Sequence, residues 1–191
     1  MVFSARILAG LFFALVSLSL FAAEVAGIKL EERDKVGNSD LQLNGAGLRT
    51  RVFFQVYAIG LYLPEKKTSS ADAIGAPGAK RIVLHMLRDV DADDFSEALM
   101  DGLRANNSEI DMKAFGPSVQ QLTGIINELK EARKGMRITL DWLPGRGTGV
   151  TFDGRPAGAP IAGEDFYRGL LRIWLGDRPV QDDLKKALLG G

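Results

Sequence analysis

The stretch "GLRTRVFFQVYAIGLYL", residues 47–63, places two arginines in front of a run of aromatic and aliphatic side chains. Aromatic and β-branched residues fit a pleated, partly buried surface, so the run predicts a β-strand. Arg49 and Arg51 share one face of a regular strand, because successive side chains alternate between the two faces. The stretch therefore predicts a strand with a cationic group at the mouth of an apolar surface.

The flanking segments extend this pattern to the whole chain. Upstream, residues 25–33 and 40–43 are predicted as short strands, and "NGAG" at 44–47 as a turn. Downstream, the order is a strand at 81–87, helices at 91–107 and 118–133, strands at 136–143 and 149–154, and closing helices at 164–175 and 180–189. Strands and helices in such blocks predict an α+β fold, with helices packed against a mainly antiparallel sheet.

The composition is that of an ordinary globular domain. The chain has 191 residues, 46% of them hydrophobic and 25% charged, which is enough to bury a sizeable core. Its 24 basic and 24 acidic residues cancel, so no overall field draws the protein to nucleic acid or to an anionic membrane surface. The sequence has no cysteine, which excludes disulfides and thiolate chemistry, and neither a cofactor nor a metal is expected.

The first 23 residues have the layout of a secretory signal peptide. Arg6 is the only charge before Glu24, and an apolar core ends in small residues. We expect cleavage near Ala22 or Ala23, a single domain at 24–191 without a membrane span, and a periplasmic or secreted protein. An uncleaved anchor helix is the alternative, because Leu20 or Phe21 occupies the third position before the cut.

Three short motifs suggest chemistry that their context does not support. His85, the only histidine, lies inside an apolar strand, where a packed residue is expected more often than a catalyst. The loop "GRGTG" at 145–149 has no P-loop lysine and precedes a strand, so we expect a hairpin turn. "DVDADD" at 89–94 lacks the glycine and the distal glutamate of a calcium loop, and an acidic helix start explains it better.

Three segments carry a resemblance to a known family. They are "LNGAGLRTRVFFQVYAIGLYL" at 43–63, "DFSEAL" at 94–99 and "FDGRPAGAPIAGEDFYRGLLRIWLGDRPVQDDLKKALLG" at 152–190. Together they resemble the chalcone isomerase-like proteins, in particular their secreted bacterial branch. The resemblance implies an open-faced sandwich, in which helices are layered on one face of a large antiparallel sheet, with a cleft between them. Plant members cyclise chalcones, and non-catalytic relatives bind fatty acids.

The resemblance also implies which positions face the cleft. The threonine of true isomerases that helps to hold a catalytic water falls at Tyr57, and their helix tyrosine falls at Phe95. Their asparagine falls at Gly102, and the hydroxyl residue of the closing helix at Ile173. In each case a hydrogen-bonding group that cyclisation needs is missing or relocated, so no catalytic residue is predicted.

Arg49 is the best match to the arginine that, in both branches of the family, meets the polar end of the ligand. A guanidinium can hold a carboxylate through two parallel hydrogen bonds while an apolar slot buries the tail. Arg51 is the rival position, and a solvated arginine beside an edge strand is the alternative explanation. Eight residues of straight strand would separate Arg49 from Tyr57 by about 26 Å, so the two can share a ligand only if the chain reverses near Thr50.

Three function classes follow. The leading one is an exported, non-catalytic protein that binds a fatty acid or similar apolar carboxylate through Arg49, Tyr57, Phe95, Gly102 and Ile173. The second is an isomerase or intramolecular lyase acting on another substrate. The third is a structural or partner-binding domain whose cleft is filled by its own side chains, such as Phe53, Phe54 or Trp174. The natural ligand, the oligomeric state and the pathway stay open.

Overall fold

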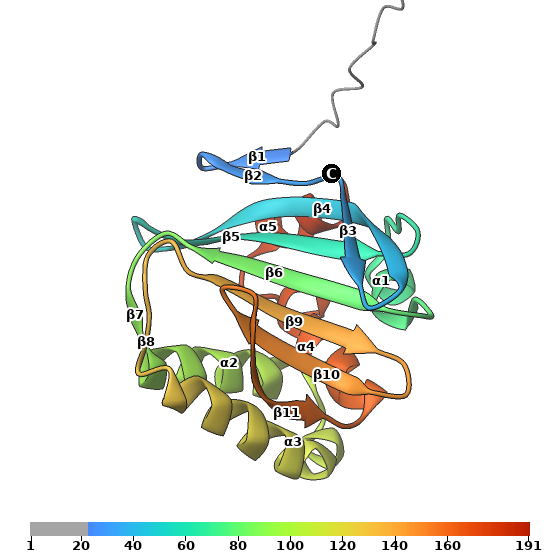
Figure 1. Ribbon diagram of the computed structural model, residues 1–191, viewed down its shortest axis with the longest axis vertical. Helices are drawn as coiled ribbons and strands as arrows, with labels where there is room; N and C mark the ends of the chain where they lie inside the picture. The colour runs from blue at the N-terminus through green and yellow to red at the C-terminus, as the bar shows by residue number, and fades with distance from the viewer. Residues whose placement is uncertain (1–22) are drawn as a thin grey trace, which may run out of the picture.

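One seven-stranded sheet organises the chain (Figure 1). The computed structural model describes residues 23–191, so the predicted signal peptide lies outside the described residues except for Ala23. The strand order is β11-β10-β9-β6-β5-β4-β3, and each neighbouring pair is antiparallel. The strands are β3 (Arg33–Val36), β4 (Ser39–Arg51), β5 (Phe54–Leu63), β6 (Lys80–Met86), β9 (Arg137–Leu143), β10 (Gly147–Phe152) and β11 (Arg155–Ile161).

Five helices and two small sheets complete the described fold. The helices are α1 (Ser70–Gly75), α2 (Ala92–Asn106), α3 (Glu109–Glu128), α4 (Glu164–Leu175) and α5 (Asp182–Leu188). The small sheets pair β1 (Ala23–Val25) with β2 (Ile28–Leu30), and β7 (Val90–Asp91) with β8 (Glu131–Ala132). The helices pack on one face of the large sheet, as an open-faced sandwich requires, so the predicted α+β fold is confirmed.

The two faces of the sheet bury two separate cores. The larger core lies between the sheet and the helices and includes Tyr57. The smaller core lies on the opposite face, where β2 and β3 cover part of β4, β5 and β6, and it includes Tyr62. Neighbouring side chains of a strand alternate in direction, so residues five positions apart point to opposite faces. The opposite orientation of the two tyrosines, expected from their spacing, is therefore present.

The glycine-rich segment at 44–47 is not a turn, contrary to the prediction. β4 runs through it from Ser39 to Arg51, with a bulge between Leu43 and Gly45. A Cβ atom on Gly45 would overlap the carbonyl oxygen of Ala187 in α5. The Asn44 side chain donates a hydrogen bond of 2.7 Å to the Leu188 carbonyl. The small residues therefore allow α5 to pack closely against β4, a long-range contact that local turn propensities do not predict.

The reversal of the chain lies further along, at Val52 and Phe53. Arg51 pairs with Phe54 across a two-residue hairpin, and Val52 has a φ of +59°. A branched residue is strained in this left-handed region, where glycine is the usual choice. Turn chemistry could therefore not have located this hairpin.

Other element boundaries also differ from prediction. The predicted strand at 25–33 contains a hairpin turn, because Ala26 and Gly27 both have positive φ. The predicted helix at 118–133 begins nine residues earlier, at Glu109, where Ser108 and Asp111 form a capping box. It also ends earlier, because Lys130 adopts a φ of +63°. Pro117 suggests a helix start in the sequence but lies inside this helix.

We predict that Gly45→Ala lowers the free energy of unfolding by about 3 kcal/mol, because the new methyl group meets the backbone of α5 and not a side chain that could move. Gly149→Ala in β10 is the matched control, since the nearest atom would be 3.9 Å from its Cβ. It should leave stability unchanged or slightly raised. Urea unfolding followed by circular dichroism measures the free energy of unfolding of both variants. Equal changes in the two would contradict the close packing of α5 against Gly45.

Candidate functional site

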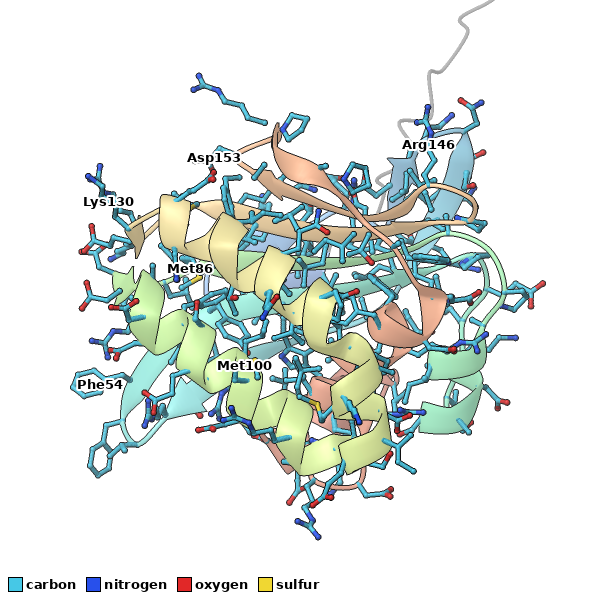
Figure 2. All side chains as sticks on the ribbon, turned by 90° about the horizontal axis from the view of Figure 1, so that it is seen from below. Phe54, Met86, Met100, Lys130, Arg146 and Asp153 are labelled. Carbon is cyan, nitrogen blue, oxygen red and sulfur yellow. The ribbon has the colours of Figure 1, made fainter. Side chains whose placement is uncertain are left out.

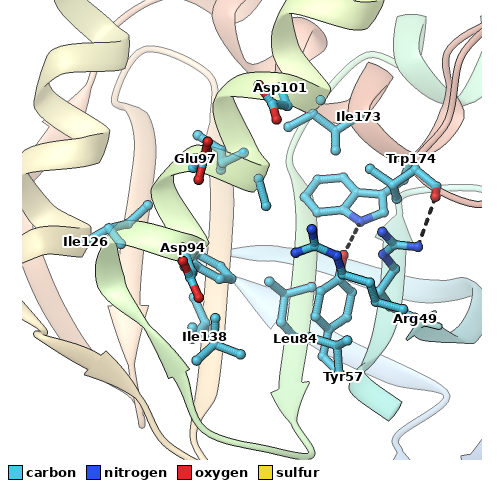
Figure 3. A pocket seen from close by; sticks show the side chains of 18 of the residues that line it. Arg49, Tyr57, Leu84, Asp94, Glu97, Asp101, Ile126, Ile138, Ile173 and Trp174 are labelled. Atoms are coloured by element: carbon cyan, nitrogen blue, oxygen red, sulfur yellow. Dashed lines mark hydrogen bonds between the residues drawn. The ribbon is translucent and has the colours of Figure 1, made fainter. Parts of the chain in front are cut away.

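A cleft opens between the helix-covered face of the sheet and helices α2, α3 and α4 (Figure 3). Its volume is about 880 Å³, within the range of about 300–1,000 Å³ that is common for small-molecule sites. The sheet and α3 contribute a buried aliphatic part of its lining: Leu84, Leu122, Ile126, Ile138, Leu140 and Val150. Such a surface can bury hydrocarbon without offering it hydrogen bonds.

The five residues that the sequence singled out all line this one cleft. Arg49 lies directly opposite Tyr57 in the pairing of β4 with β5. Directly opposed residues of antiparallel strands have Cβ atoms about 5 Å apart, so the chain reversal removes the predicted separation. Arg51 also lines the cleft but is exposed at the hairpin, nearer to solvent than Arg49.

One side of the Arg49 guanidinium is fixed by the segment that follows α4. Its Nη1 donates to the carbonyls of Thr50 at 2.8 Å and Val180 at 3.0 Å, and to Gln181 Oε1 at 3.3 Å. Among the described residues, no carboxylate forms a salt bridge with Arg49, and its guanidinium also lies close enough to the Tyr57 hydroxyl to favour the ionised form of that phenol. Arg49 is therefore held in position through Nη1, while the other N–H groups of its guanidinium stay available for a ligand.

Tyr57 provides a second polar group beside this arginine. The indole Nε1 of Trp174 donates to the Tyr57 hydroxyl oxygen at 3.0 Å (Figure 3). Burial raises the pKa of Tyr57 above its usual value of 10, and the Trp174 hydrogen bond and the charge of Arg49 offset only part of this rise. The phenol is thus neutral at physiological pH. Because its oxygen already accepts from Trp174, its proton is left to donate to a group in the cleft.

The loop between α4 and α5 is fixed on both sides of the cleft. Gln181 donates from Nε2 to the Leu48 carbonyl at 3.0 Å and accepts from the Thr50 amide at 2.8 Å. On the helix side, Asn106 of α2 accepts from the Arg178 amide and donates to the Arg178 carbonyl. Sequence analysis did not assign a role to Gln181 or Asn106. The "IWLGDRPVQDDLK" segment that carried the family resemblance was the only signal for this loop.

Phe95, Gly102 and Ile173 form an apolar wall where α2 crosses α4. A Cβ atom on Gly102 would lie 2.8 Å from Ile173 Cγ2, so this glycine permits the close approach of the two helices. Both residues are buried, and Phe95 packs against the same core. None of the three side chains offers a hydrogen bond, so this part of the cleft suits hydrocarbon.

Opposite charges line the two rims of the cleft. Asp94, Glu97 and Asp101 follow one another along α2 (Figure 3). Arginines line the other side, from β4 and from the loop after α4: Arg49, Arg51 and Arg178. An anionic head group is repelled by the first rim and attracted by the second. The charge distribution therefore favours one orientation of an acidic ligand.

Two of the other candidate motifs lie apart from this chemistry, whereas Asp89, Asp91 and Asp94 of the "DVDADD" segment line the cleft. His85 points to the outer face of the sheet, and burial together with the nearby Arg137 lowers its pKa. The "GRGTG" segment belongs to the β9–β10 hairpin, as expected. In residues 23–191 no three histidine or carboxylate side chains gather where they could hold a metal ion. No helix in that range combines the length and the apolar character needed to cross a membrane.

The architecture is that of an open-faced sandwich with a ligand-sized cleft between sheet and helices. The chain belongs to the chalcone isomerase-like family, whose sequence model matches residues 22–190. A fatty-acid binding protein of Arabidopsis thaliana has a similar fold, with a TM-score of 0.62 over 85% of this chain and 92% of that one. The two are 16% identical, so the likeness concerns the fold alone. No curated protein sequence matches the chain. The predicted family is confirmed.

We predict that none of the three tyrosines of the folded protein ionises near pH 10. Burial raises the pKa of Tyr62 to about 12 and also raises the pKa of Tyr57 and Tyr167. The unfolded chain loses its phenolic protons near pH 10, so the free energy of unfolding should fall as pH rises above that value.

Phenolate absorbance measured against pH, in buffer and in urea, tests this. Tyr57→Phe should leave the curve of the folded protein unchanged below about pH 11. Titration of one tyrosine near pH 10 in the folded wild-type protein, lost in that variant, would show that Tyr57 is open to water.

Proposed function

We propose that this protein is an exported, non-catalytic binder of a fatty acid or a similar apolar carboxylate. The observation that carries the proposal is the pairing of Arg49 with Tyr57 across two strands, at the polar end of an aliphatic cleft. The guanidinium and the neutral phenol each offer a proton to a carboxylate. The Arabidopsis protein of similar fold is a fatty-acid binding protein, which supports the same ligand class.

The apolar character of Phe95, Gly102 and Ile173 supports a binding role and not catalysis. Cyclisation requires donors aimed at a phenolate and at a developing enolate. Phe95, Gly102 and Ile173 supply none, although they occupy the positions where the resemblance places such groups. The same substitutions suit an alkyl chain.

Burial of the tail supplies most of the expected affinity. Each buried methylene contributes about 0.8 kcal/mol, whereas a charge-assisted hydrogen bond contributes about 1.5–3 kcal/mol in total. Affinity should therefore rise about fourfold for each added methylene until the cleft is full. The head group then determines orientation and discriminates between acids and neutral lipids.

The proposal predicts a selective effect of Arg49→Gln on acids. Binding of dodecanoic acid should weaken about 10-fold to 100-fold, because one charge-assisted contact is lost, while binding of dodecanol should change much less. The ratio of the two affinities is the readout, since the substitution also removes the hydrogen bond to Val180. Isothermal titration calorimetry measures it.

Two further variants serve as controls for this experiment. Arg51→Gln tests the rival arginine and should have a smaller effect on the acid. Ala98→Phe, at an exposed position that lines the cleft, should weaken acid and alcohol alike, whereas Arg104→Phe on the same helix, outside the lining, should weaken neither. Failure of the wild-type protein to bind either ligand, or equal losses for acid and alcohol in Arg49→Gln, would refute the proposal.

Export rests on the sequence of the first 23 residues. The mature chain should begin close to Glu24, after removal of a segment whose only charge is Arg6. N-terminal sequencing of the protein recovered from the cell envelope or the medium tests this. Material that begins at Met1 would instead indicate a retained anchor.

A further inference from the structure

The tip of the β4–β5 hairpin carries three large apolar side chains in solvent. Val52 is 80% exposed, Phe53 93% and Phe54 60%. Figure 2 shows the Phe54 side chain projecting away from the body of the molecule. Only one other large hydrophobic residue of residues 23–191, Ile110, has comparable exposure, and it lies alone in the first turn of α3. Single exposed apolar residues are common, but three adjacent ones indicate a contact surface.

The backbone of this tip is strained at Val52, because the residue there is not one that adopts its conformation easily. Val52 holds a φ of +59° in a two-residue turn, where glycine or asparagine would be accommodated more easily. Folding alone gains nothing from valine and phenylalanine at these positions, because neither Val52 nor Phe53 packs against either core. Departures from local rules of this kind concentrate at functional sites.

Two arginines flank the apolar tip. Arg51 precedes it on β4, and Arg88, in the loop after β6, lies over the Phe54 ring with 4.9 Å between its guanidinium carbon and the ring centroid. Neither arginine forms a salt bridge with a carboxylate among the described residues. The tip therefore combines exposed aromatic surface with two arginines that no described carboxylate pairs with, although Asp89 and Asp91 line the same cleft.

The tip also forms part of the mouth of the cleft. Arg51, Val52, Phe54 and Arg88 line the same cavity as Arg49 and Tyr57. A surface that receives the tip thus comes to lie against the cleft opening.

We propose that the Val52–Phe54 tip docks on an anionic lipid bilayer, with the two phenylalanines at the boundary of head groups and acyl chains and with Arg51 and Arg88 at the lipid phosphates. Apolar residues beside basic ones are the composition that favours this interface. A convex two-residue turn reaches into a bilayer easily. It offers on the order of 500 Å², which is less than the roughly 800 Å² per partner of a stable protein interface.

Vesicle flotation without added fatty acid tests the docking separately from the proposed ligand. Residues 23–191 are used, because they contain both cores and nearly all of the family match. They should float with vesicles of phosphatidylethanolamine and phosphatidylglycerol and bind pure phosphatidylcholine more weakly. Each arginine should contribute about fivefold to partitioning at low salt, so Arg51→Gln with Arg88→Gln should remove most of the preference for anionic vesicles.

The double variant Phe53→Ser with Phe54→Ser should lower partitioning at least tenfold, and Ile110→Ser should not. Both replace exposed side chains, and unchanged thermal unfolding would show that the variants remain folded. In Phe53→Trp, brominated lipids should quench the new tryptophan, while the buried Trp142 and Trp174 give a constant background.

Several outcomes would overturn the proposal. They are an absence of vesicle binding, equal losses in the Ile110→Ser control, and a Phe53→Trp fluorescence that brominated lipids do not change. Concentration-dependent self-association in sedimentation velocity that disappears with the double serine variant, together with absent vesicle binding, would assign the tip to a second copy of the chain.

Discussion

The antiparallel pairing of β4 with β5 is the constraint on which the rest of the site depends. Because the chain reverses at Val52 and Phe53, Arg49 is placed opposite Tyr57 and the apolar turn is placed at the mouth of the cleft. A shift of this register by one residue would send the Arg49 side chain to the outer face of the sheet. One-residue bulges, at Asn44 on β4 and at Val56 on β5, fix the register at both ends of the paired segment.

The polar end of the cleft is assembled from segments that are far apart in the sequence, and this gives it rigidity. Gln181 bonds to the backbone of β4, Trp174 bonds to Tyr57, and Asn106 holds the intervening loop from the side of α2. A guanidinium and a phenol fixed before a ligand arrives lose little conformational entropy on binding. The aliphatic part of the cleft needs no such precision, since burial of hydrocarbon is non-directional.

The sequence predicted the fold class and the residues of the cleft better than it predicted the connections. Phe95, Gly102 and Ile173 were identified through the family resemblance, and all three line the cleft. The glycines at 45 and 47 were misinterpreted as a turn, because their role is to admit α5, which follows more than 130 residues later. The true hairpin was missed because Val52 and Phe53 are poor turn formers. Hydrogen bonds such as that from Gln181 to Leu48 have no local signature at all.

If both proposals hold, the positions of Arg49 and of the hairpin tip determine how a fatty acid must move from the bilayer into the cleft. In a bilayer an acid has its head group at the interface and its tail inside, whereas in the cleft the head group would lie at Arg49, near the docked tip, and the tail would point away from the membrane. The acid must therefore turn over on its way in. Phe54 and Val56 line the cleft between the tip and Tyr57, so the tail can follow an apolar surface during this turn and avoid water. The carboxylate meanwhile passes from one arginine to the next, from Arg51 to Arg49, and stays away from the acidic rim of α2.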